Sequence, residues 1–362
     1  MKQYIGCDAH ARYSVFVSVD EMGRVGAPVR VEHGSRDLRD YLNGLEKETA
    51  VAVEASGGWY WFMDELEAAG LDARLVNPLE AKRRIGGRNK TDKLDARGLA
   101  ILLRNGTLPE VWIPPAELRD LRGLMRGRLA MRSHTTVLKN RIHTALKRYG
   151  TLDGGVVSDL FAKKQRLKLS LAIGRMPEET RRTTLHEWEL LDEVERHIGE
   201  LEARIRFRIG RLGWVRLWKS LPGVGEILGA TIHLEIGDVH RFATAAHLAS
   251  YAGLVPTVHA SGGKSYAGPT SKQANHYLRW AFVEAADCIL MHRHRFTGHH
   301  ALQLYDRVKA KKCHGKAAVA VARHLAESSW WILCKREKYR QPHAAAVSSS
   351  KERVSAEVSL AH

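Results

Sequence analysis

The sequence predicts an α/β amino-terminal domain built on a mixed sheet, a helical and coiled-coil middle, and a mainly α carboxy-terminal domain. Apolar, β-branched runs alternate with helical patterns over the first 80 residues, whereas residues 115–220 contain no strand pattern. Helical patterns also dominate after residue 220. With 362 residues the chain is too long for one small core and fits two or three domains.

A meander of three strands is expected first. Residues 4–10 (YIGCDAH) and 13–20 (YSVFVSVD) are apolar and β-branched, and a tight turn separates them. Residues 27–33 (APVRVEH) fit a third strand after the turn at Met22 and Gly23.

Alternating helices and strands follow the meander. Helical spacing begins at residues 35–45, with Ser35 as the N-cap, and the later elements are a strand, a helix and a strand. A meander followed by alternating units predicts a mixed sheet with helices on its faces. The later elements are expected at residues 49–55, 58–70 and 72–78.

The middle of the chain is predicted to be helical and basic. Residues 117–150 have the pattern of a long basic amphipathic helix. Further on, apolar residues keep a 3-4 spacing that only Arg208 interrupts, which is typical of a coiled-coil seam. This seam could pack within one chain or join two chains. Its members are Leu191, Val194, Ile198, Leu201, Ile205 and Leu212.

These patterns divide the chain into four segments. The α/β domain is expected at 1–110, the basic helical region at 111–215 and the carboxy-terminal domain at 216–340. Residues 341–362 are small, polar and without a core pattern, so we expect a disordered tail.

Charge is the most informative bulk property. The formal net charge is +17, and between Lys82 and Arg148 there are 17 Lys or Arg against 5 Asp or Glu. So concentrated an excess favours nucleic acid as the partner over a solvated basic face.

The sequence has no long apolar run and no signal-peptide core, so we expect no membrane contact and a cytoplasmic protein. The four cysteines have no metal-ligand spacing.

Four carboxylates are expected to converge at one edge of the sheet. Asp8 ends the first strand and Glu54 ends the strand at 49–55, while Asp92 and Asp95 share a helix face at positions i and i+3. Each alone has an ordinary explanation as a turn cap or a helix start. Together they would repel one another unless a divalent cation lay among them, and Mg²⁺ suits oxygen ligands. Two such ions about 3.5–4 Å apart could clamp a phosphodiester.

The acidic pair lies among cations, which we interpret as guides for a phosphate backbone rather than as salt-bridge partners. The sequence does not decide which of Asp92 and Asp95 would bind metal directly. The cations are Arg88, Lys90, Lys93 and Arg97.

Three motifs, "IGCDAH", "VEASGGWYWFMDELEAAGLDARLVNP" and "NKTDKLDA", resemble the amino-terminal domain of the DEDD insertion-sequence transposases. This "IS one-ten" family includes the Piv-type DNA invertases. The resemblance implies a ribonuclease-H-like fold similar to RuvC-type resolvases. It also implies a Mg²⁺-binding set at Asp8, Glu54, Asp92 and Asp95.

The second half opens on "LPGVG" (221–225), which resembles a helix-hairpin-helix turn before an apolar helix. Gly223 and Gly225 would let the backbone approach a phosphate at the start of that helix. The alternative is an ordinary glycine-rich helix start with no ligand.

Between "YAGLVP" and "NHYLRWAF" the sequence is rich in Ser, Gly and Lys, and we expect an irregular loop between helices. Ser261 is followed there by two glycines, so its hydroxyl could reach a phosphorus atom without steric interference. The region 220–290 resembles the family's carboxy-terminal domain, which carries a nucleophilic serine. That role falls to Ser261, with Ser265 and Ser271 left open.

One position departs from the family pattern, because Ala274 stands where relatives commonly have glycine, which puts the geometry of that turn in question. Three cations of this region are expected to contact the phosphate backbone: Lys264, Lys272 and Arg279.

The function expected from these features is site-specific DNA recombination through a phosphoserine intermediate, which conserves bond energy and needs no ATP. No phosphate-binding loop of the G-x-x-x-x-G-K-[ST] type is present. The resemblance further implies donor and target DNA, a bridge RNA that chooses the sites, and composite active sites in a dimer or tetramer. Two alternatives stay open: a junction-resolving endonuclease that uses metal-activated water, and a non-catalytic nucleic-acid-binding scaffold.

Overall fold

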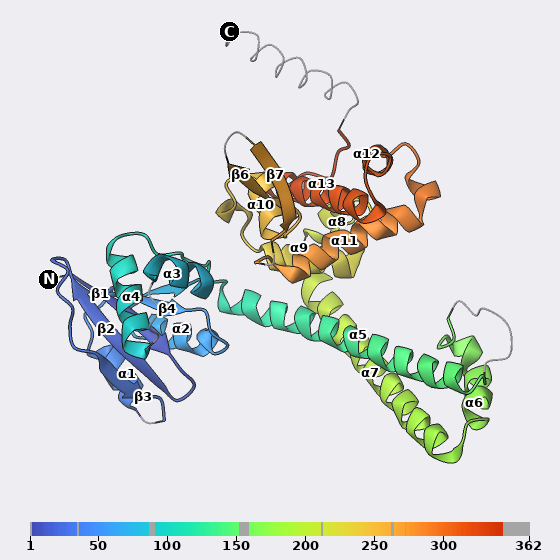
Figure 1. Cartoon of the computed structure of the whole chain (residues 1–362), viewed down its shortest axis with the longest axis horizontal. Coiled ribbons are helices and arrows are strands. Elements are labelled where there is room, and N and C mark those ends of the chain that lie inside the picture. The colour runs from blue at the N-terminus through green and yellow to red at the C-terminus, as the bar shows by residue number, and fades with distance from the viewer. Residues whose placement is uncertain are drawn as a thin grey trace, which may run out of the picture. The chain divides into compact units, whose positions relative to one another are not determined.

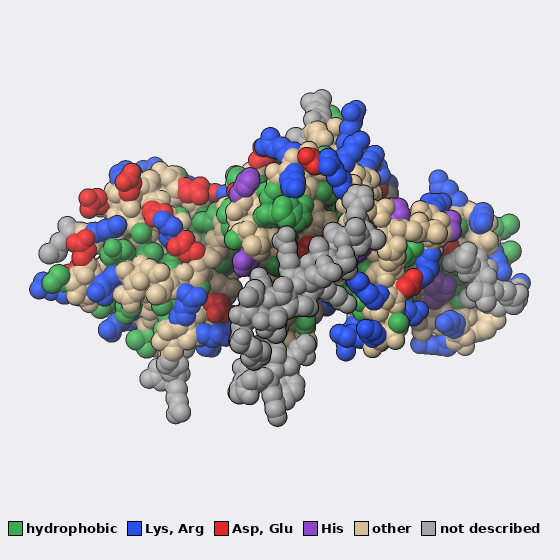
Figure 2. Space-filling model, turned by 90° about the horizontal axis from the view of Figure 1, so that it is seen from above, with side chains coloured by type: hydrophobic (Ala, Val, Ile, Leu, Met, Phe, Trp, Pro, Cys, Tyr) green, Lys and Arg blue, Asp and Glu red, His purple; other side chains and the backbone are tan. Residues whose placement is uncertain are grey.

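A computed structural model describes residues 2–34, 36–86, 91–151, 159–210, 213–261, 264–271 and 273–342 (Figure 1). The chain divides into two compact units, residues 1–114 and 115–362. Lys and Arg side chains are scattered over both units on the face shown in Figure 2. Among the described residues, no helix is long and apolar enough to cross a membrane.

The first unit contains a five-stranded mixed sheet, as predicted, in the order β3-β2-β1-β4-β5. The first three strands are antiparallel neighbours, whereas β4 and β5 run parallel to β1. The expected succession of strands and helices is confirmed, although several elements are shorter than predicted. The strands are β1 (Gln3–Ala9), β2 (Tyr13–Asp20), β3 (Val29–Glu32), β4 (Ala50–Glu54) and β5 (Asp72–Val76).

Local sequence explains where the helices of this unit begin. The Asn77 side chain accepts hydrogen bonds from two backbone N–H groups, and Pro78 occupies the first helical position of α3. Thr91 caps α4 by accepting from Leu94 N. The predicted N-cap at Ser35 lies outside the described residues. The helices are α1 (Asp37–Asn43), α2 (Trp59–Ala68), α3 (Pro78–Ile85) and α4 (Asp92–Arg104).

The two faces of the sheet are covered by different helices. Cys7 and Val53 belong to a core shared with Leu38 of α1 and Phe62 of α2. Ala52, on the opposite face, packs in a cluster with α3 and α4. Because side chains alternate along a strand, the residues next to Cys7 and Val53 face α4.

Gly6 lets α4 lie directly on the backbone of β1. A Cβ atom at Gly6 would come 1.9 Å from Ala96 O and 2.6 Å from Ala100 N. We therefore expect Gly6→Ala to lower the free energy of unfolding by about 3 kcal/mol, because backbone atoms would have to move apart. Urea unfolding measures this effect. Gly57→Ala is the matched control, since a Cβ there meets nothing within 4 Å. Equal unfolding free energies for the two variants would contradict the close approach.

The second unit starts with a long antiparallel helix pair, α5 (Ala116–Arg148) and α7 (Glu178–Gly210), with α6 (Arg166–Gly174) beside α7 (Figure 1). The basic helix predicted at 117–150 is therefore confirmed. Leu191 packs with α5 near Ile142, and Ile205 packs with α5 near Met125.

The predicted seam at 191–212 thus faces α5 of the same chain at Leu191 and Ile205, both almost fully buried. Of the two interpretations left open, the structure favours packing within the chain. A dimer that uses these same residues would have to displace α5. Leu212 lies outside the described residues.

The rest of the second unit is mainly helical, as predicted, and has its own core around Trp218, Phe282 and Leu325. Short 3-10 segments occur at Lys163–Gln165, Val239–Arg241 and Arg293–Phe296. The expected tail lies outside the described residues after Pro342. The helices are α8 (Val215–Trp218), α9 (Glu226–Ile236), α10 (Ala245–Tyr251), α11 (His276–Met291), α12 (His300–Lys309) and α13 (His314–Lys335).

The prediction of an irregular loop around Ser261 is wrong. The segment forms an antiparallel hairpin of β6 (Pro256–Ser261) and β7 (Lys264–Thr270). The sequence signal for a hairpin is the Gly-Gly pair between the two runs, because such pairs are common in two-residue hairpin turns. The two glycines themselves lie outside the described residues. Apolar periodicity is weak in these strands and did not reveal them.

Candidate active site

Strand register brings two of the predicted carboxylates to neighbouring strand ends. Cys7 of β1 pairs with Val53 of β4 in parallel, so the next residues, Asp8 and Glu54, lie at the carboxyl ends of adjacent strands. Both follow residues that face the α1–α2 core, and they therefore lie on the face that α4 covers. The expected convergence of strand-end carboxylates agrees with this register.

The amino terminus of α4 supplies the second acidic pair. Asp92 and Asp95 lie in the first helical turn, after the Thr91 cap. The partial positive charge at a helix amino terminus favours carboxylates there by about 0.3–1 kcal/mol each. Close packing of α4 against Gly6 fixes the distance between this turn and the end of β1.

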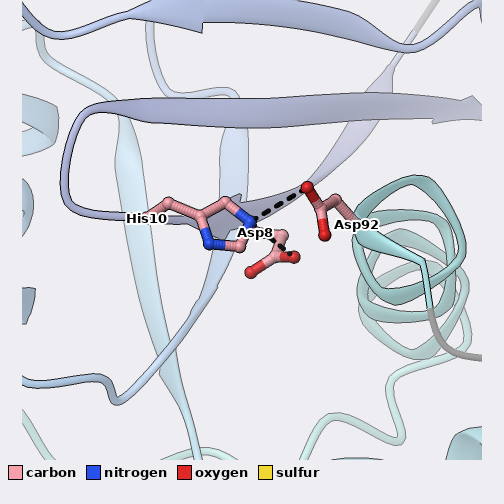
Figure 3. A group of neighbouring side chains, drawn as sticks. All are labelled: Asp8, His10 and Asp92. Carbon is pink, nitrogen blue, oxygen red and sulfur yellow. Dashed lines mark ion pairs between the residues drawn. The ribbon is translucent and has the colours of Figure 1, made fainter.

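Asp8 and Asp92 meet at a histidine that sequence reasoning missed. His10 Nε2 lies 3.3 Å from Asp8 Oδ2 and 3.1 Å from Asp92 Oδ2 (Figure 3). This nitrogen is shielded from solvent and lacks the alignment of a hydrogen bond to either carboxylate. One potential ligand atom from each of the three residues lies within 4.8 Å of the others.

Tyr13 contacts the Asp92 carboxylate at the same oxygen as His10. Its hydroxyl donates to Asp92 Oδ2 at 3.0 Å, and the guanidinium of Arg30 lies 3.6 Å from the centre of its ring. The hydrogen bond lowers the pKa of Asp92, and a charge on His10 also lowers it, while desolvation opposes both. The same bond raises the pKa of Tyr13. Asp92 is therefore kept as a carboxylate.

A sequence signal for the two missed residues did exist. His10 stands two positions after Asp8, a spacing that puts both on one side of an extended chain. Tyr13 begins β2, across the turn that follows β1. Neither residue type stands out until the pairing of β1 with β2 is known.

The remaining predicted residues of this site are less closely assembled. Glu54 and Asp95 are half-buried but do not belong to the three-residue group. Lys93 and Arg97 are exposed on α4. Arg88 and Lys90 lie outside the described residues, so their predicted contact with a phosphate backbone has no structural counterpart here.

The donor set fits a divalent cation. Two carboxylates and one imidazole within 4.8 Å are a common ligand combination for Mn²⁺ and similar ions, whereas Mg²⁺ prefers oxygen alone. Nearby Glu54 and Asp95 could add oxygen ligands. The group therefore suits metal chemistry at a phosphate.

The second unit carries the predicted serine at the end of a strand. Ser261 is the last residue of β6 and its Cα is paired with that of Lys264, while Ser265 is paired with Ala260. Ser271, the other alternative, follows β7 and accepts a hydrogen bond from Gln273 N at 3.1 Å. Its hydroxyl therefore stabilises a turn.

Three further positions singled out in the sequence follow this hairpin along the chain. Lys272 lies outside the described residues, and Arg279 is half-buried in α11. Ala274, which departs from the family pattern, lies against Gly253, where a Cβ would come 2.6 Å from Ala274 Cβ. Glycine at 253, with φ of +69°, therefore makes room for alanine at 274.

The "LPGVG" glycines have different surroundings. Gly223 has φ of +74°, and a Cβ there would come 2.1 Å from Ala285 O of α11, so this glycine is needed for packing. Gly225 is exposed and directly precedes α9. Glu226, in the first turn of α9, pairs with Lys219 at 2.7 Å. The predicted phosphate contact of both glycines stays a prediction.

Two family models match this chain. Residues 5–151, which include the Asp8–His10–Asp92 group, match a model described as Transposase, of the DEDD type named for IS110. Residues 215–301, which include the serine hairpin, match the Transposase IS116/IS110/IS902 family. Together the two matches span both places where chemistry was expected.

Curated relatives carry related names. A protein of Coxiella burnetii named "Transposase for insertion sequence element IS1111A" is 26% identical over 93% of this chain and 91% of its own. A "Probable family 20 transposase" of Pseudomonas aeruginosa is 26% identical over 84% of this chain and 89% of its own. The "Insertion element IS110 uncharacterized 43.6 kDa protein" of Streptomyces coelicolor is 38% identical over 29% of this chain and 25% of its own.

A solved structure that this chain is similar to is entitled "T. thermophilus RuvC in complex with Holliday junction substrate". The match covers 31% of this chain and 100% of that chain, at 13% identity and a TM-score of 0.24. A similarity at this level supports no conclusion.

Proposed function

Because the chain belongs to the IS110-type DEDD transposases, enzymes that cleave and rejoin DNA, we propose that it is the recombinase of an insertion sequence and acts through a phosphoserine intermediate. The observation that carries the proposal is the Asp8–His10–Asp92 group at the first turn of α4. A serine hairpin lies in the other matched region. We also propose that the mixed sheet of the first unit has the ribonuclease-H-like fold.

The acidic group is proposed to hold a divalent cation, with Mg²⁺ as the expected ion. Asp8 and Asp92 would be ligands, together with Glu54 and Asp95 from the neighbouring strand end and helix turn. His10 would add a nitrogen ligand when the ion is Mn²⁺. When bound there, the cation would act as a Lewis acid on phosphate oxygens. Tyr13 would keep Asp92 ionised and oriented through its hydrogen bond.

Ser261 is proposed as the nucleophile. Its Oγ gives up its proton and forms a bond to phosphorus, the bond from phosphorus to one strand oxygen breaks, and that oxygen takes up one proton and leaves as a hydroxyl. Attack by a strand hydroxyl on the phosphoserine reverses these changes and rejoins DNA without ATP. Serine needs activation for such an attack. Lys264 and Arg279 are proposed to stabilise the charge that develops on the phosphate.

The partners proposed are donor DNA, target DNA and a bridge RNA, bound by a dimer or tetramer with composite active sites. The net charge of +17 supports polyanionic partners. The α5 helix supports extended contact with nucleic acid, because its 33 residues carry many cations and few carboxylates.

His10 gives a test of the metal site that does not depend on catalysis. We expect His10→Asn to weaken Mn²⁺ binding by about 10- to 100-fold, with a smaller effect on Mg²⁺, because imidazole suits the transition metal better. Titration calorimetry with each ion measures both affinities. His186→Asn, an exposed histidine of α7, is the control. An unchanged Mn²⁺ affinity in His10→Asn would remove His10 from the ligand set.

The proposed function is tested by purifying the protein with its bound nucleic acid and sequencing that nucleic acid. Nicked donor DNA is then added, and the covalent adduct is mapped by mass spectrometry. We expect a structured RNA and an adduct on Ser261. DNA cleavage without any adduct would support a junction-resolving endonuclease instead. Binding without cleavage would support a scaffold.

A further inference from the structure

A groove runs between α5 and the amino-terminal turns of α9 and α11, with a volume of about 770 Å³. All of these elements belong to the second unit. From α5 it is lined by Arg126, Arg128 and Arg132, and from α11 by Tyr277 and Trp280. Arginine planes and aromatic rings in one groove are typical of surfaces that bind unpaired bases.

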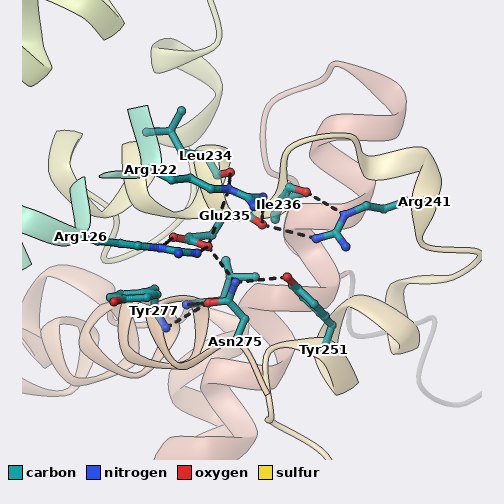
Figure 4. Close-up of polar contacts among 10 residues, drawn as sticks. Arg122, Arg126, Leu234, Glu235, Ile236, Arg241, Tyr251, Asn275 and Tyr277 are labelled. Atoms are coloured by element: carbon teal, nitrogen blue, oxygen red, sulfur yellow. Dashed lines mark hydrogen bonds and ion pairs between the residues drawn. The ribbon is translucent and has the colours of Figure 1, made fainter. Parts of the chain in front are cut away.

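Arg126 is held in one orientation by a buried carboxylate. Its Nε and Nη2 each donate to Glu235 at 2.8 Å, and the Glu235 side chain is only 1% exposed (Figure 4). Asn275 Nδ2 donates to the same carboxylate at 2.8 Å, while Asn275 Oδ1 caps α11. The guanidinium carbon of Arg126 lies 4.6 Å from the centre of the Tyr277 ring. Arg126 and Tyr277 therefore form a fixed pair of planar groups.

The arginines of the groove differ in whether a carboxylate already binds them. Arg126 is paired with Glu235, and Arg128 donates to Glu202 at 2.7 Å, so both guanidiniums already have carboxylate partners. Such a paired guanidinium gains less from a phosphate but still offers a flat face for stacking. Arg132 is exposed and can supply a phosphate contact.

We propose that this groove binds an unpaired nucleotide of a nucleic-acid strand. The base stacks on the planar groups of Arg126, Tyr277 and Trp280, and Arg132 contacts the adjoining phosphate. The inference rests on the proposed function only in taking nucleic acid as the ligand. Because α11 begins shortly after β7 ends, the nucleotide would be held by the helix that follows the serine hairpin.

The test compares strands that share phosphates but differ in bases. Full-length protein is titrated with fluorescent oligo-dT, oligo-U and matched strands in which abasic residues replace the bases. We expect Tyr277→Leu and Trp280→Leu each to weaken binding of a base-bearing strand by roughly 5- to 100-fold, and to leave the abasic strand unaffected. Arg132→Gln should weaken the binding of both kinds of strand. It should also lower the slope of log affinity against log salt concentration by about one, the value of a single phosphate contact.

Several controls separate stacking from loss of structure. Trp280 also packs against the core of its unit, so thermal unfolding is recorded, and Trp280→Phe should retain most of the affinity because it keeps an aromatic ring. Lys311→Gln removes an exposed cation that does not line the groove and should have little effect on either strand. Oligo-dT and oligo-U show whether DNA or RNA supplies the nucleotide.

The proposal is overturned if the Tyr277 and Trp280 variants lose no affinity, or lose equal affinity for abasic and base-bearing strands. Neither Ser261 nor a metal ion takes part in this titration. Failure to find a phosphoserine adduct would therefore refute the proposed chemistry and leave the proposal for the groove intact. Unchanged strand binding in the Tyr277 and Trp280 variants would refute the groove and leave the proposed chemistry intact.

Discussion

Replacing Ser261 with alanine is expected to abolish the covalent protein–DNA adduct and to reduce strand exchange by on the order of 10⁴-fold or more, because the attacking oxygen is removed. The hairpin should survive, since the pairing of Ser261 with Lys264 is a backbone feature that alanine preserves. Denaturing electrophoresis of the protein with end-labelled nicked DNA detects the adduct, and sequencing of recombination products measures exchange.

The two nearby serines provide matched controls for this variant. Ser265→Ala should keep the adduct. Ser271→Ala should keep it as well, with a loss of about 1 kcal/mol in unfolding free energy, because Gln273 N loses its acceptor. An adduct that persists in Ser261→Ala and disappears in one of the other two would reassign the nucleophile. Cleavage of supercoiled plasmid by Ser261→Ala would instead point to hydrolysis at the acidic site.

The sheet could be predicted from sequence because its signals are local. Alternation and β-branched residues in "YSVFVSVD" and "TAVAVEA" specify strands, and helical spacing between them specifies crossovers. The hairpin at Ser261 was missed because its strands carry little apolar alternation. Only the Gly262–Gly263 pair indicated the turn, and glycine pairs are equally common in loops.

The acidic site was predictable in part. Asp8, Asp92 and their placement at a strand end and a helix start follow from local patterns. His10 and Tyr13 become neighbours of Asp92 only through the pairing of β1 with β2 and the packing of α4 on Gly6. Those contacts join residues about 80 positions apart, which periodicity does not report.

The same reason explains why the groove on α5 had no sequence signature. In the sequence, Arg126 is one cation among many on a basic amphipathic helix. Its carboxylate partner, Glu235, is 109 positions away and fully buried. Because Glu235 already neutralises the Arg126 guanidinium, this group offers a flat surface for stacking rather than a contact to phosphate. A count of charges along the chain cannot separate a paired arginine from one that is available to phosphate.

Asp92→Asn is expected to lower recombination by on the order of 10³-fold while the protein remains folded. Asparagine keeps the size of the side chain, and its carbonyl oxygen can still accept the Tyr13 hydroxyl, so the contact between β2 and α4 should persist. The negative charge is lost at the point where His10 and Asp8 converge. Divalent-ion affinity should therefore fall together with activity, which calorimetry and recombination assays measure on the same preparation.

Glu21→Gln is the control for this variant, because it removes an exposed carboxylate of the same unit from the turn after β2. It should change neither property. The stability cost of Asp92→Asn should stay within about 1 kcal/mol, since the helix start loses one favourable charge but keeps its Thr91 cap. Undiminished recombination in Asp92→Asn would mean that the acidic group does not take part in the reaction. Lost activity with unchanged metal affinity would mean that Asp92 acts on the substrate rather than on the ion.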